Sequence, residues 1–141
     1  MHKRGQILAA AKAALEGTGK PAELGVETGR VRPADQDELP LLILTWANDP
    51  KKQVTLGAIP REDRTLRLRC LLWGLGTDDD LDAYFVWIEK ALKADTTLGG
   101  LARLLEYVDS TPDLQFWGVP LAAAAVDFDV NYRVHLKDPE Q

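Results

Sequence analysis

Residues 122–136, AAAAVDFDVNYRVHL, decide the fold that we expect for this chain of 141 residues. Along this stretch, apolar residues such as Val126, Phe128 and Val130 alternate with charged or polar residues. A period of two is the pattern of a β-strand that buries one of its faces. The stretch therefore predicts a long strand with an apolar face on the core and a polar face opposite.

Two more elements are expected in the residues before this strand. Residues 64–73 also alternate and predict a strand with one apolar face and one basic and aromatic face. Thr77 is a capping residue, and the apolar residues after it recur three and four positions apart, which predicts a helix to about Lys93. The helix residues expected on the core side are Leu81, Phe85, Ile88 and Leu92.

The remaining segments complete a single domain. We expect a helix over residues 4–15, a short strand within 26–31, a buried strand over 41–46, a strand or short helix over 101–108, and a turn with a short strand over 109–118. Residues 17–40 and 47–63 are rich in proline, glycine and charge, which predicts flexible loops, or a long hairpin in the second case. The whole chain, residues 1–141, is expected to be one α+β domain with a mixed, largely antiparallel sheet and helices packed on one face.

The composition disfavours several classes of protein. The chain has 17 basic and 22 acidic residues, a formal charge of −5, so direct binding to nucleic acid is not expected. One cysteine and two histidines cannot form an intramolecular disulfide or a zinc site built from such residues. No apolar run reaches about 18 residues, and the basic N-terminus is not followed by the apolar run of a signal peptide. We therefore expect a cytosolic protein without a membrane segment.

Four aspartates, Asp78, Asp79, Asp80 and Asp82, form the most conspicuous cluster of potential ligands. Hard divalent cations such as Mg²⁺ prefer several carboxylate oxygens. However, these residues fan around the axis of the expected helix, and the helix dipole favours negative charge at its start. The dipole is the stronger interpretation, so no metal or cofactor is expected, with an effect of Mg²⁺ on oligomerisation as the alternative.

The residues for covalent or acid–base catalysis are few. Cys70 falls in the apolar row of a strand and is expected in the core, and His135 is expected to be a solvated strand residue. The sequence Gly74-Leu75-Gly76 lacks the rest of a phosphate-binding motif and precedes four acids. The chain is therefore not expected to be an enzyme.

The polar rows of the two long strands favour interactions between surfaces. They are complementary in charge, with Arg67, Arg69 and Trp73 on one strand and Asp127, Asp129 and Arg133 on the other. These rows either pair across the sheet within the chain or form an exposed face that meets another subunit. Four tryptophans, at positions 46, 73, 87 and 117, support the second alternative.

Several phrases occur in an order that resembles a known family. They are 7–11, 29–33, 37–46, 64–66, 78–82, 94–101 and 120–132. The most characteristic phrase is 94–101, ADTTLGGL. In their order and spacing the chain resembles the tail terminator family of long-tailed phages and prophages, the lambda minor tail protein U type.

This resemblance implies a structural role without enzyme activity. Members of the family cap the tail tube as a ring, usually of six subunits, which ends tube polymerisation and provides the surface that joins the head. The implied partners are further copies of the chain, the tail tube protein and a head–neck connector protein. The implied location is the host cytoplasm during assembly and then the virion tail, and the implied fold is a mixed sheet with helices packed on it.

Two sets of residues are the candidates for these contacts. For the interface between subunits we expect Arg64, Arg67, Arg69 and Trp73 against Asp78, Asp79, Asp80 and Asp82 of a neighbour. For the tube or neck we expect Lys51, Lys52 and Arg61. Two alternatives remain: a related neck or head-completion protein, and, more distantly, a small metal-dependent hydrolase that uses the four aspartates.

Overall fold

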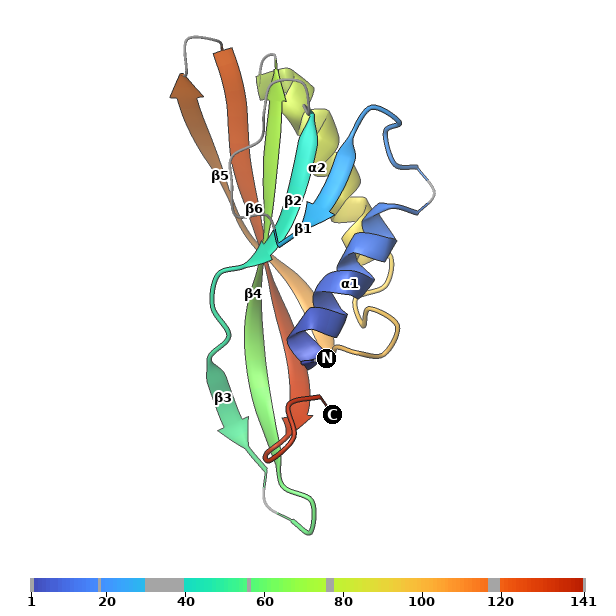
Figure 1. Ribbon diagram of the computed structural model, residues 1–141, viewed down its shortest axis with the longest axis vertical. Helices are drawn as coiled ribbons and strands as arrows, with labels where there is room; N and C mark the ends of the chain where they lie inside the picture. Colours follow the sequence, from blue (N-terminus) through green and yellow to red (C-terminus); the bar gives the residue numbers. More distant parts are fainter. Residues whose placement is uncertain are drawn as a thin grey trace.

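The computed structural model of the protein describes residues 2–17, 19–29, 40–55, 57–75, 78–116 and 120–140; the side chains of residues 52, 53, 75, 78–81, 112–116 and 120–123 lie outside that description. In chain order, its elements are α1 (Lys3–Leu15), β1 (Gly25–Thr28), β2 (Leu41–Trp46), β3 (Lys51–Val54), β4 (Arg61–Leu75), α2 (Asp78–Lys93), β5 (Leu104–Phe116) and β6 (Pro120–His135) (Figure 1).

The strands of the described residues form one six-stranded sheet. Its order is β1-β2-β4-β6-β5, and β3 pairs with β4 beyond the end of β2. β1 and β2 run parallel, and all the other pairs are antiparallel. β4 and β6 pair along nearly their whole length, from Arg61 opposite His135 to Leu75 opposite Leu121. The expected α+β fold with a mixed, largely antiparallel sheet is confirmed.

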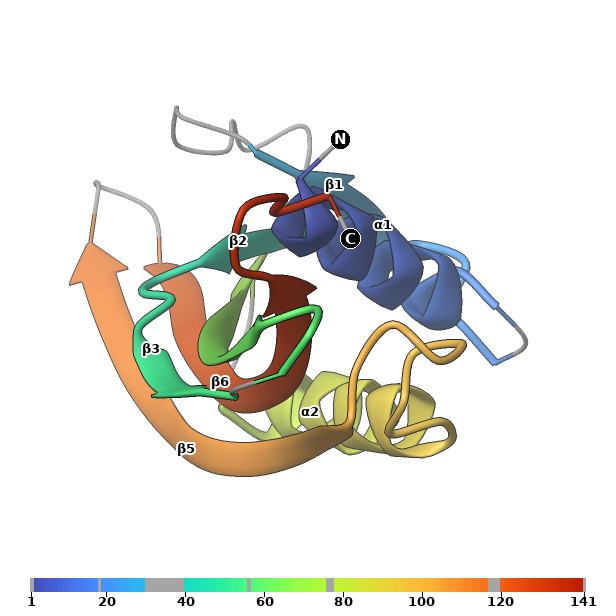
Figure 2. The same ribbon diagram turned by 90° about the horizontal axis from the view of Figure 1, so that it is seen from below.

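Both helices lie on the same side of the curved sheet (Figure 2). Ile7, Ala11 and Leu15 of α1 and Ile88 and Leu92 of α2 are buried there, at the spacing that the sequence predicts. They share one core with the apolar rows of the two long strands. The rows are Leu66, Leu68, Cys70 and Leu72 in β4 and Ala124, Val126, Phe128, Val130, Tyr132 and Val134 in β6. Leu136, which continues the pattern of β6, is instead exposed beyond its end.

Strand β5 decides between the two structures expected for residues 101–108 and corrects the turn expected after them. The segment 101–108, which the pattern left open, contributes to a strand. The turn expected from residue 109 is wrong, because β5 continues to Phe116. A bulge between Tyr107 and Asp109 shifts the register against β6, so the alternation changes phase there. The strand also contains Pro112, which is tolerated because β5 is at the edge of the sheet.

Two alternatives were expected for the segment 47–63, a flexible loop or a long hairpin, and the structure has the hairpin. β3 pairs with the first residues of β4, with Gln53 opposite Asp63 and Val54 opposite Glu62. This β3–β4 hairpin extends past the helices at one end of the molecule (Figure 1). Leu136 donates its backbone N–H to the carbonyl of Pro60 at 3.0 Å, so the residue after β6 lies beside the turn of the hairpin.

The phrase 94–101 forms the turn that ends α2. The carboxylate of Asp95 accepts hydrogen bonds from the backbone N–H and hydroxyl of Thr97 and from the backbone N–H of Gly99. Leu98 is buried with a φ of 49°, and Gly99 and Gly100 continue with φ of 72° and 89°, a region that favours glycine. The double glycine therefore follows from the path of the backbone at this turn.

Candidate interaction surfaces

The face of the sheet opposite the helices, here called the outer face, carries a row of ion pairs. Nε and Nη2 of Arg69 donate to the two carboxylate oxygens of Asp127, at 2.9 and 3.1 Å. Beside this pair, Nε of Arg67 donates to Oδ1 of Asp129 at 2.7 Å. The register of β4 and β6 places each arginine directly opposite its aspartate. The polar rows of the two long strands therefore pair across the sheet within one chain, which is the first of the two alternatives left open by the sequence.

A third ion pair continues this row toward the hairpin. Arg133 donates to both carboxylate oxygens of Asp63, at 2.6 and 3.3 Å, and Arg103 approaches the same carboxylate at 3.7 Å. The hydrogen bonds from Arg133 lower the pKa of Asp63. In the same way, the hydrogen bonds to Asp129 and Asp127 raise the pKa values of Arg67 and Arg69. The charges in this row are thus balanced largely within the chain.

Trp73 lies at the other, apolar end of the outer face. It is half-buried and pairs with Leu41 of β2, which is buried together with Ile43. Leu41 and Ile43 belong to the outer face, because Leu42 and Leu44 face the core. The structure therefore places Trp73 on the same face as Arg67 and Arg69, and their contact with a second subunit remains a prediction.

Arg64 does not join that face. It is separated from Arg67 by an odd number of positions, so its side chain lies on the helix side of β4. There Nε of Arg64 donates to Oε1 of Glu62 at 2.6 Å, and Nη1 lies 3.7 Å from Oδ2 of Asp49. A role for Arg64 in the interface between subunits remains a prediction.

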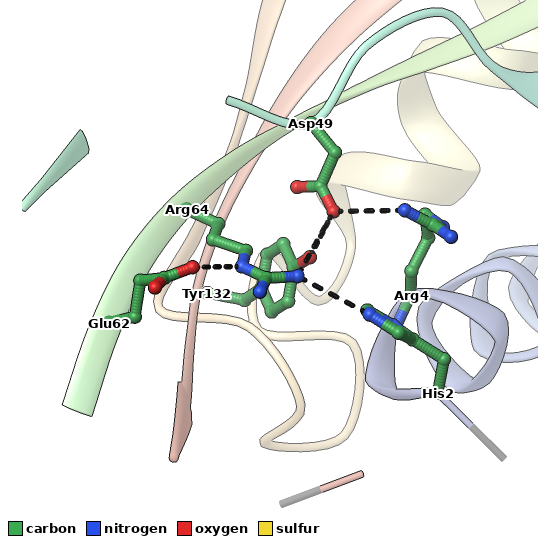
Figure 3. A network of polar contacts seen from close by, with 6 residues as sticks. All are labelled: His2, Arg4, Asp49, Glu62, Arg64 and Tyr132. Carbon is green, nitrogen blue, oxygen red and sulfur yellow. Dashed lines mark hydrogen bonds and ion pairs between the residues drawn. The ribbon is translucent and has the colours of Figure 1, made fainter. Parts of the chain in front are cut away.

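Asp49 is the centre of a polar cluster that the sequence analysis missed (Figure 3). Its Oδ2 accepts a hydrogen bond from the hydroxyl of Tyr132 at 2.5 Å and from Nη1 of Arg4 at 3.3 Å. Only 4% of the Asp49 side chain is exposed. We call the set His2, Arg4, Asp49, Glu62, Arg64 and Tyr132 the Asp49 network. It joins the start of α1 to the segment after β2 and to strands β4 and β6.

The other oxygen of this carboxylate lacks a hydrogen-bond partner in the described part of the chain. Oδ1 of Asp49 is buried without a hydrogen bond to any group of the described residues. The charge of Asp49 is offset by two guanidinium groups, which is what an aspartate buried to this degree requires. The guanidinium of Arg4 also lies 4.0 Å from the ring centroid of Trp46, a cation–π contact. This arrangement is typical of a structural ion-pair centre that fixes α1 against the sheet.

His2 contributes to the same network at the first turn of α1. Its Nδ1 accepts a hydrogen bond from the backbone N–H of Arg4 at 2.9 Å, which caps the helix. Its Nε2 lies 3.3 Å from Nη1 of Arg64. Burial, followed by the charges of Arg4 and Arg64, lowers the pKa of His2. The network therefore favours the neutral imidazole.

The acidic cluster is described only in part. Asp78, Asp79 and Asp80 form the first turn of α2, but their side chains lie outside the described part, and Asp82 is exposed. Among the described residues, no group of three or more histidine, cysteine, aspartate or glutamate residues could hold a metal ion. A role of the four aspartates in binding Mg²⁺ or a neighbour therefore remains a prediction.

The candidates for tube or neck contact lie on the β3–β4 hairpin. Lys51 is in β3 and Arg61 begins β4, and both side chains are exposed. Lys52 is also in β3, and its side chain lies outside the described part. Cys70 is fully buried in the core, as expected, and burial raises the pKa of its thiol.

Comparison of the sequence with protein-family models and with curated proteins finds no match. Within the described residues, no helix is long and apolar enough to cross a membrane.

Proposed function

We propose that this chain is a structural protein of a phage or prophage tail. In this role it is a tail terminator, which caps the finished tube as a ring of six copies, ends tube polymerisation and offers the surface that joins the head. Its partners are further copies of itself, the tail tube protein and a head–neck connector protein. It acts in the host cytoplasm during assembly and then remains in the virion tail, without enzymatic activity.

The observation that supports this proposal is the position of the family-like phrases in the fold. Residues 7–11 lie in α1, 41–46 form β2, and 78–82 open α2. The phrase 94–101 forms the turn after α2, and residues 120–132 lie in β6. Each of these five stretches thus lies in an element or a junction of a single α+β fold, which is the kind of fold that the resemblance implies; residues 30–33 and 37–39, which belong to the phrases 29–33 and 37–46, lie outside the described part.

The arrangement of the sheet is compatible with assembly. The described helices cover one face only, and β5 has no strand on its outer side in the described sheet. Unpaired strand edges and uncovered faces are surfaces on which another chain can dock. A closed ring of identical subunits needs two different contact surfaces on each copy.

The deciding experiment adds the purified chain to polymerising tail tube protein from the same phage or prophage genome. We expect the tubes to stop growing and electron micrographs to show a ring at one end only. Light scattering after size exclusion, with and without millimolar Mg²⁺, measures whether the ring forms from the isolated chain and whether the aspartates at the start of α2 matter.

Two results would contradict the proposal. Tubes that bind none of the chain and grow to the same length would exclude a terminator. Binding to the portal vertex of heads instead of tube ends would identify a neck or head-completion protein. The matched control is bovine serum albumin at the same concentration, which must leave tube length unchanged.

A further inference from the structure

The end of the β3–β4 hairpin forms an exposed patch that is apolar and basic. Ile59 in the turn is 59% exposed, and Leu136, beside it, is 44% exposed. Arg61 and Lys137 flank them, and neither forms an ion pair with a described residue. The nearby carboxylate of Asp138 accepts a hydrogen bond from the backbone of Glu140. We call Ile59, Arg61, Leu136 and Lys137 the hairpin-end patch.

The edge strand β5 carries a second patch of similar character but opposite charge. Leu104 and Val108 are 41% and 36% exposed, although both are large apolar residues. Glu106, between these two residues, and Asp109, beside Val108, are also exposed. Neither forms an ion pair with a cation of the described residues. Arg67 and Arg69, on the same face of the sheet in β4, are already bound to aspartates of β6. We call Leu104, Glu106, Val108 and Asp109 the β5-edge patch.

These two patches cannot meet within one copy. The hairpin-end patch lies beside His135 at the end of β6, whereas Glu106 lies opposite Asp129. Six residues along a strand separate these positions, about 20 Å at 3.3 Å per residue. A second copy of the chain can bring a hairpin-end patch to the β5-edge patch, because the patches are complementary in charge and both expose aliphatic side chains.

We infer that the hairpin-end patch of one copy docks on the β5-edge patch of the next copy. In this contact the basic residues of the first patch, Arg61 and Lys137, face the acidic residues of the second, Glu106 and Asp109. The aliphatic side chains of the two patches, Ile59 and Leu136 on one and Leu104 and Val108 on the other, pack against each other. The two surfaces differ, so the contact is head-to-tail, and a pair of copies keeps one free patch at each of its two ends for further copies.

This inference rests on the proposed function in one respect: a ring of identical copies requires a head-to-tail contact of this kind. In place of the expected pairing of Arg67 and Arg69 with acids of a neighbour, this contact uses charged residues that form no ion pair with a described residue. It also moves Arg61 from the expected tube or neck contact to the contact between copies.

The first test is chemical cross-linking of the full chain. The variant I59C/V108C is treated with a bis-maleimide, whose spacer tolerates differences in the exact register of the two copies. We expect a ladder of covalent oligomers beyond the dimer, and neither single variant, I59C or V108C, should give the ladder. Native Cys70 is buried and does not contribute. The absence of cross-links overturns the inference, and so do dimers that never extend, because they indicate a two-fold contact.

The second test exchanges the charges. Arg61→Glu and Glu106→Arg should each weaken self-association by about tenfold at low salt, and the double exchange should recover most of the loss. Lys90→Glu, a matched reversal on an exposed position of α2, should leave association unchanged. If the double exchange fails to recover association, the contact is not between these residues.

Tube capping separates this inference from the proposed function. If the chain caps tubes and the ladder is absent, the proposed contact is wrong and the terminator role stands. If the ladder forms and tube length is unaffected, the contact stands and the terminator role is wrong.

Discussion

Tyr132 donates its hydroxyl hydrogen to Oδ2 of Asp49 at 2.5 Å, across 83 positions of sequence. Tyr132 is fully buried near the end of the apolar row of β6, so its hydroxyl must find its partner inside the protein. Asp49 is that partner, and it also binds Arg4 at the start of α1. A single carboxylate thus connects the long strand that decides the fold to the first helix.

We therefore expect Tyr132→Phe to lower the free energy of unfolding by about 1–2 kcal/mol, because it removes a donor from a buried carboxylate. Urea denaturation followed by tryptophan fluorescence measures this loss. The matched control is Tyr107→Phe, whose hydroxyl contacts Ser110 on an exposed part of β5 and whose loss should cost less than about 0.5 kcal/mol. Equal losses in the two variants would contradict a special role for the Asp49 network.

The ion pair of Arg69 with Asp127 should be stronger than an ordinary surface pair, because both carboxylate oxygens are bound and only 13% of the Asp127 side chain is exposed. A double-mutant cycle with Arg69→Ala and Asp127→Ala should give a coupling energy of about 1–2 kcal/mol. The exposed pair of Lys93 with Glu89, at 3.3 Å on α2, should give about 0.3–0.5 kcal/mol in the same cycle. A coupling no larger than that of the helix pair would show that the outer face is held by backbone pairing alone.

The long strands were predictable because their alternation is strictly local. Each apolar row in β4 and β6 is visible in a window of a few residues, and so are the helix spacings of α1 and α2. The partner of each strand is not local information, which is why the pairing of Arg67 and Arg69 with the aspartates of β6 stayed one of two alternatives. β5 was cut short in the sequence analysis because the bulge after Tyr107 reverses the phase of its alternation.

The Asp49 network left almost no signal in the sequence. Asn48-Asp49-Pro50 has the composition of a turn, and nothing near it indicates that its aspartate is buried. The one available clue was Tyr132, the only hydroxyl in an otherwise apolar row of β6. Its partner could be any acceptor in the chain, so the position of Asp49 depends on the tertiary fold.

His2 should make the stability of the protein sensitive to mildly acidic conditions. Its pKa in the folded protein is lowered from the ordinary value of 6.5, so folding favours the neutral form. The stability that it contributes is present above pH 6.5 and is lost as the pH falls below that value toward the lower pKa of the folded state. His2→Asn keeps a capping side chain but cannot be protonated in this range. Between pH 8 and pH 5, the free energy of unfolding should therefore fall more for the native chain than for this variant. A difference between the two that stays constant with pH would contradict the arrangement around His2.

Cys70 reports on how the sheet opens. The thiol is fully buried between the helices and the centre of β4, and burial raises its pKa, so both access and ionisation oppose its reaction. We expect a disulfide reagent to label it at least about 10³-fold more slowly than an exposed thiol introduced by Ile59→Cys, because labelling requires unfolding of the core. Raising the urea concentration should accelerate labelling of Cys70 in parallel with global unfolding. Labelling that is slow but independent of urea would instead indicate that β4 is exposed by a local opening, and in that case the two long strands would not form the most stable part of the fold.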